Sequence, residues 1–123
     1  MRKILAAAFA GTLIMGTSLA YAVDPASKTV AKLYQEKKAL SGKLVQVKGK
    51  VVKVNNGIMG RNFLHVQDGT GDKSSNDLTV TSKQTANVGD SVVITGKVVL
   101  DRDFGAGYTY PLLIEESTIA PGK

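Results

Sequence analysis

The 123-residue chain contains no cysteine and only one histidine. Without cysteine, the chain cannot form disulfide bonds, thiolate metal sites or a lipid-modified cysteine. His65 has no second histidine with which to hold a metal ion. No serine lies in a motif that supplies a histidine and a carboxylate, and Glu115 and Glu116 are adjacent, so they would point to opposite faces of a strand. We therefore expect no metal, no cofactor and no enzymatic activity.

Aromatic residues are also scarce, at 6% of the chain. Proteins that bind single-stranded nucleic acid stack bases on several aromatic side chains, and here only Phe63 and Tyr108 are good candidates. Two loop motifs are incomplete as well. Asp101–Gly105 lacks the further oxygen ligands and the final glutamate of a calcium loop. Gly105–Gly107 is not followed by the lysine and the serine or threonine of a phosphate-binding loop.

The single long apolar run lies at the start of the chain. Arg2 and Lys3 precede the apolar residues 4–15, and Ala20 and Ala22 supply small residues around a cleavage site. This pattern is typical of an export signal in residues 1–22, and the run is short for a membrane span. The alternative is an uncleaved anchor. We expect cleavage after Ala22, a periplasmic product and no transmembrane segment in the remaining chain.

Charge is unevenly distributed along the rest of the sequence. Residues 23–61 carry nine basic and two acidic side chains, a net charge of +7, whereas residues 62–123 carry five basic and eight acidic ones, a net charge of −3. The basic half would suit an anionic partner. The alternative is a set of ordinary solvated lysines on a helix and an outer sheet face.

Residues 42–119 alternate between apolar and polar positions and are interrupted by glycine-rich turns. The pattern predicts five strands, the first and fourth long and each with a central glycine, over approximately 44–54, 62–67, 77–82, 91–101 and 110–114. This plan is typical of an all-β, five-stranded Greek-key barrel of the OB type. Gly49 and its neighbours are expected to absorb a change of strand phase.

Residues 23–41 are expected to form an amphipathic helix and a linker before the barrel. Asp24 and Pro25 resemble a helix start, Gly42 a helix end, and Leu33 and Tyr34 lie on one apolar face. We expect this helix to pack on the barrel, with partner binding as the alternative. Residues 120–123 are expected to be a short tail.

Three blocks of the chain resemble a group of small exported bacterial proteins that contain an OB domain of the nucleic-acid-binding type. They read TVAKLYQEKKALSGKLVQVKGKVVKV, IMGRNFLHVQDGTGD and VVLDRDFGAGYTYPLLIEE. The shorter pattern at residues 47–51 and 63–71 is also similar to anticodon-binding OB domains of aminoacyl-tRNA synthetases. The resemblance implies the OB fold, and it transfers a ligand poorly because one fold hosts many functions.

A candidate binding face follows from strand alternation. Leu64 and Val66 should face the core, so their neighbours should face outward. The predicted face combines aromatic, basic and hydroxyl side chains: Lys48, Lys50, Arg61, Phe63, His65, Thr79, Lys97 and Tyr108. The alternative is a generic solvated sheet.

The expected function is that of a monomeric, exported binding module without enzymatic activity. Its partner would be a small anionic molecule or an envelope protein, and the alternative is a single-stranded oligonucleotide.

Overall fold

The computed structural model describes residues 24–122, and the expected export signal lies outside this range. The described chain contains one helix and six strands: β1 (Ala26–Ser27), α1 (Val30–Leu40), β2 (Leu44–Ile58), β3 (Arg61–Gln67), β4 (Leu78–Ser82), β5 (Ser91–Asp103) and β6 (Thr109–Pro121). Across residues 24–122, α1 is the sole helix, and it is too short and too polar to cross a bilayer.

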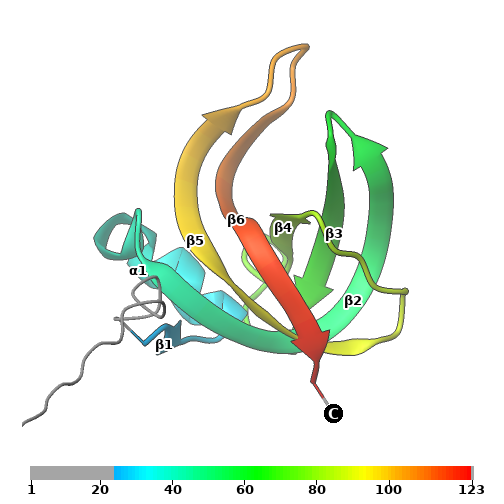
Figure 1. The fold of residues 1–123 in the computed structure, drawn as a ribbon. Coiled ribbons are helices and arrows are strands. Elements are labelled where there is room, and N and C mark those ends of the chain that lie inside the picture. Colours follow the sequence, from blue (N-terminus) through cyan, green and yellow to red (C-terminus); the bar gives the residue numbers. More distant parts are fainter. Residues whose placement is uncertain (1–23, 123) are drawn as a thin grey trace, which may run out of the picture.

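All six strands belong to one sheet in the order β1-β2-β3-β4-β6-β5, and β2 also pairs with β5. The first half of β2 pairs with β5, from Leu44 opposite Lys97 to Lys50 opposite Ser91. Its second half pairs with β3. Figure 1 shows β2 curving strongly between these two partners. The strand pairings therefore form a ring that begins and ends on β2.

Gly49 lies where β2 passes from one partner to the other. A Cβ atom at this position would lie 2.5 Å from Val66 Cγ1 and 2.8 Å from the Gln67 carbonyl oxygen, so only glycine allows this close approach. The register of β2 against β3 then shifts between Val51 and Lys53. The predicted phase change in this strand is confirmed, and it is a β-bulge.

The strands of the β2–β3 and β5–β6 hairpins are longer than the sequence pattern indicated. β2 continues to Ile58, and Met59 and Gly60 form the tip with positive φ angles of 52° and 79°. Two such residues make the tight turn that suits the twist of a hairpin. Residues 120–121, expected in a tail, extend β6, where Pro121 pairs with Val92. The expected loop and tail were therefore wrong in extent.

The helix begins five residues later than expected, at Val30. Thr29 caps it by accepting a hydrogen bond from the Lys32 N–H at 3.1 Å. The residues before it are extended because they pair with β2 as strand β1, with Ala26 opposite Val45. Gly42, with φ of 81°, follows the helix end as predicted.

A single apolar core fills the inside of the curved sheet. Leu64 and Val66, which were predicted to face inward from β3, are fully buried in it, as are Leu78 and Val80 of β4. Two residues of α1, Val30 and Leu33, are also fully buried in the same cluster. The helix therefore packs on the sheet, as expected, and completes its core.

Candidate functional site

The outer face of β3 and β4 points where strand alternation predicted, but it is not exposed. Phe63, Thr79 and Thr81 are only 4%, 7% and 2% exposed. The Phe63 ring lies outside the core cluster and packs against Phe104 and Tyr110, at centroid distances of 5.4 and 5.8 Å. The predicted exposed stacking platform is therefore wrong, because the long β5–β6 hairpin brings two aromatic rings onto this face.

His65 is hydrogen-bonded to a neighbouring carboxylate and keeps 24% of its side chain exposed. Its Nδ1 lies 2.6 Å from Asp77 Oδ1, and Asp77 Oδ2 also accepts a hydrogen bond from Gln67 at 3.1 Å. The Tyr34 hydroxyl of α1 donates to the Asp77 carbonyl oxygen at 2.6 Å. Burial, with a smaller effect from the Asp77 charge, raises the pKa of Tyr34. This network ties the helix to the sheet.

Three other predicted site residues, Lys48, Lys50 and Tyr108, do not line the hollow that contains Arg61. Lys48 and Lys50 line a different shallow hollow of about 550 Å³ together with Gly69. Tyr108 is 55% exposed in the β5–β6 turn. The structure therefore divides the predicted face, and these side chains do not form one site.

Arg61 and Lys97 do come together, in a groove of about 770 Å³ on the outer face. We call it the arginine groove. Its lining comes from β3, β5, β6 and the end of β4, and its charged members are Arg61, Lys83, Lys97, Arg102, Glu115 and Glu116. Two of the eight predicted site residues therefore lie in this groove.

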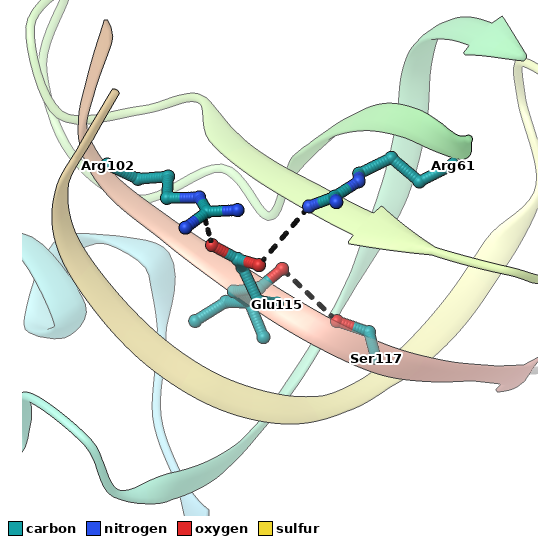
Figure 2. Close-up of polar contacts among 5 residues, drawn as sticks. Arg61, Arg102, Glu115 and Ser117 are labelled. Atoms are coloured by element: carbon teal, nitrogen blue, oxygen red, sulfur yellow. Dashed lines mark hydrogen bonds and ion pairs between the residues drawn. The ribbon is translucent and has the colours of Figure 1, made fainter. Parts of the chain in front are cut away.

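Glu115 lies at the centre of the groove between two arginines (Figure 2). Its side chain is only 12% exposed, and its two carboxylate oxygens lie 3.4 Å from Arg61 Nη1 and 3.2 Å from Arg102 Nε. Removing a carboxylate from water is costly unless cations compensate for the lost hydration. The two arginines supply that compensation, and the buried carboxylate in return fixes where they lie.

The Arg102 contact is an ion pair without hydrogen-bond geometry. Its buried Nε has no hydrogen-bond partner among the described residues, although Glu115 Oε2 is close to it. Both guanidinium groups also lie over the Phe104 ring, with Cζ 5.1 Å from its centroid for Arg61 and 4.7 Å for Arg102. Such contacts favour cations over a ring face. The aromatic cluster thus supports the arginines.

A β-bulge in β6 places Glu115 in the groove. Glu116 has a φ of 53°, and the register against β5 shifts on passing it. Opposite the bulge, a Cβ on Gly96 would lie 2.6 Å from Ile114 Cγ2 and from Ser117 Oγ. The Ser117 hydroxyl donates to the Ile114 carbonyl at 3.3 Å (Figure 2), which bridges the bulge. A glycine and a serine therefore shape the backbone that carries the carboxylate.

Sequence reasoning missed Arg102 and Glu115. The sequence pattern ends the fourth predicted strand at residue 101 and so leaves Arg102 in a loop, whereas β5 continues to Asp103. Glu115 and Glu116 were expected on opposite faces of a strand, but both line the groove, Glu115 buried and Glu116 exposed. A charged residue directly after Leu113 and Ile114 is the signal that could have identified a buried carboxylate with cationic partners.

Within residues 24–122, no three histidine or carboxylate side chains gather closely enough to hold a metal ion. The groove instead offers cations and hydroxyl groups. Its chemistry suits the binding of an anion, because guanidinium groups donate several hydrogen bonds in a fixed plane.

Comparison with known proteins places the fold and nothing more. No protein-family model matches the chain, and no curated protein matches it. The structure is similar to a solved chain assigned as an aspartyl-tRNA synthetase from Leishmania major Friedlin, with a TM-score of 0.54 and 12% sequence identity. The match covers 93% of this chain and 24% of the synthetase, so the protein spans about a quarter of the length of that chain.

Proposed function

We propose that the protein is an exported, non-enzymatic binding module with an OB-type barrel, and that it binds an anionic ligand in the arginine groove. The ring of strand pairings and the similarity to part of a synthetase chain support the barrel. The sequence of residues 1–22 supports export to the periplasm. The observation that carries the ligand class is the pair of arginines held around one buried glutamate.

The charges of the groove favour this ligand class. Four basic and two acidic side chains line it, so its formal net charge is +2. Arg61 and Arg102 keep 30% and 42% of their side chains exposed, so they remain accessible to a ligand. An anion would gain charge-assisted hydrogen bonds there.

A single-stranded oligonucleotide is the second candidate. The guanidinium groups over Phe104 favour it, because cations and aromatic rings together are what such ligands use. Against it, Phe63, Phe104 and Tyr110 pack on one another, which leaves little ring surface for bases.

The experiment compares purified wild-type protein with an Arg61→Ala, Arg102→Ala double variant in a thermal-shift screen of small anions and short oligonucleotides. The matched control is Lys48→Ala, which removes a positive charge outside the groove. We expect the ligand found with the wild type to lose at least about tenfold in affinity in the double variant, or about 1.4 kcal/mol. The control should bind it normally.

If the control weakens binding as much as the double variant, the groove is not the site. Turnover of the bound ligand, abolished by a groove substitution, would contradict the non-enzymatic assignment. Cell fractionation and N-terminal sequencing test export, for which the expected mature chain begins at Val23.

A further inference from the structure

We propose that the arginine groove is a receptor for the phosphomonoester group of a small molecule. This inference rests on the proposed function and names the chemistry of its ligand. A phosphomonoester carries close to two negative charges at neutral pH. A carboxylate and each phosphodiester of a nucleic-acid chain carry one.

The charge of the groove matches a dianion. Arg61 and Arg102 contact Glu115, and Lys97 is its cross-strand partner and also lines the groove. Three cations around one carboxylate leave a net charge of +2. Adding the remaining charged lining residues, Lys83 and Glu116, leaves that total unchanged. A monoanion would leave half of this charge without compensation.

The hydrogen-bond donors of the arginines are largely unused by the protein. Each guanidinium carries five N–H donors. In the part of the chain that the structure describes, one hydrogen bond from these two groups is present, from Arg61 Nη1 to Glu115. The two groups approach Glu115 from different strands (Figure 2). Three terminal phosphate oxygens could accept from both groups at once, whereas a carboxylate has two oxygens.

The size of the groove and its aromatic cluster favour a small molecule over a polymer. A volume of about 770 Å³ falls within the usual range for small-ligand sites, about 300–1,000 Å³. The nearest rings, Phe63, Phe104 and Tyr110, contact one another, so successive bases would have no series of free rings on which to stack.

A matched pair of probes tests the charge requirement. Phenyl phosphate and phenyl sulfate have similar shapes, but at pH 7.5 the first is a dianion and the second a monoanion. Isothermal titration of the whole protein should give phenyl phosphate an affinity at least about tenfold higher. At pH 5 the phosphate is mostly a monoanion, because its second pKa is about 6. The ratio of the two affinities should then fall towards one.

The ratio of the affinities for phenyl phosphate and phenyl sulfate cancels most of the effect that titration of the protein's own groups has on binding. The ionisable groups that face the site are Glu115 and Glu116 from β6, Lys97 and Arg102 from β5, Arg61 from β3 and Lys83 after β4. Any change in their charge acts on both probes. His65, which pairs with Asp77 further along β3, is controlled by His65→Gln, in which the ratio should keep its pH dependence.

Two variants link the probe to the arginines. Arg102→Ala should lose at least about tenfold in affinity for phenyl phosphate and reduce the advantage over phenyl sulfate. Arg102→Lys keeps the charge but removes the planar set of donors, so it should recover only part of the loss. Circular dichroism of each variant verifies that it is folded, and Lys48→Ala should behave like the wild type.

Equal affinity for the two probes at pH 7.5 would overturn the phosphomonoester assignment. Binding of citrate without binding of phenyl phosphate would overturn it too. It would also be overturned if an oligonucleotide with a 5′-hydroxyl group bound as tightly as the same oligonucleotide with a 5′-phosphate. In those cases loss of binding in the Arg61→Ala, Arg102→Ala protein would leave the proposed anion-binding function intact. Failure of every anion to bind would overturn both.

Discussion

Phe63 shows that a side chain on the outer face of a strand can still be buried. Alternation correctly placed it on the face opposite Leu64, and it is nevertheless only 4% exposed. Truncating a buried phenylalanine removes its packing and leaves a cavity, at a cost of about 3–5 kcal/mol. We therefore expect Phe63→Ala to lower the free energy of unfolding by about that amount in urea titrations.

Val88 provides the control for this change, since it is 65% exposed. Val88→Ala should alter the free energy of unfolding by no more than about 0.5 kcal/mol. If Phe63→Ala behaves like Val88→Ala, the aromatic cluster does not hold the hairpin on this face, and the support of Arg61 and Arg102 by Phe104 must be reconsidered.

The sequence predicts on which face of a strand each side chain lies, but it does not predict whether another segment packs on that face. A strand shows which residues share a face through its period of two. It does not show that a hairpin forty residues later will lie against that face. The alternation therefore predicts the correct side for Phe63 and Thr79 but the wrong environment, and it misses Arg102 for the same reason.

The helix α1 is held at its first turn by the connection between β3 and β4. The Val30 N–H donates to Asp68 Oδ2 at 2.9 Å, and the Ala31 N–H donates to Thr70 Oγ1 at 3.0 Å. The first N–H groups of a helix have no partner within it. A loop distant in sequence supplies these partners, which explains why the helix begins at Val30 rather than at Asp24.

Asp68 gives this contact a dependence on pH. Burial alone would raise the pKa of its carboxyl, but hydrogen bonds from Thr70 and Val30 outweigh burial and lower the pKa below its ordinary value. A lowered pKa in the folded state stabilises the fold above the unfolded-state value of about 3.9. That contribution is lost as the pH falls through the folded-state pKa.

We expect Asp68→Asn to lower the free energy of unfolding at pH 7 by about 1 kcal/mol, the usual value of a helix cap. The difference from wild type should shrink as the pH falls below about 4. Urea titrations at several pH values measure both. Asp103→Asn is the control, because the Asp103 carboxylate accepts a hydrogen bond only within its own turn, from the Gly105 N–H. A difference that grows in acid would contradict the assigned role of the carboxylate.

Across residues 24–122 the helix and the strands share one hydrophobic core. The sequence pattern separated residues 23–41 from a barrel beginning at residue 42, but Val30 and Leu33 are fully buried among strand residues. A chain that starts at Gly42 would expose that apolar surface. We expect it to lose cooperative unfolding, measured by thermal melts followed by circular dichroism. A sharp melt like that of the full chain would show that the strands form an independent domain.

The positions of the five longer strands along the chain, and the inward direction of Leu64 and Val66, were accessible from the sequence because each strand carries its own alternation and turn residues. The short strand β1 was not, since two residues carry no periodicity and its pairing depends on β2. Of the arginine groove, the sequence predicted Arg61 and Lys97 but not Arg102 and Glu115. Its residues come from four strands, and a bulge at Glu116 sets their alignment.

The double pairing of β2 also has a consequence for the order of folding events. The β2–β3 hairpin brings together Ile58 and Arg61, which are close in the chain. The β2–β5 seam joins Leu44 to Lys97, about half the chain apart. Contacts between distant segments require a long loop to close before they gain any energy, so they slow folding. The hairpin can therefore form early, and the closing of the seam is expected to set the rate at which the native protein appears.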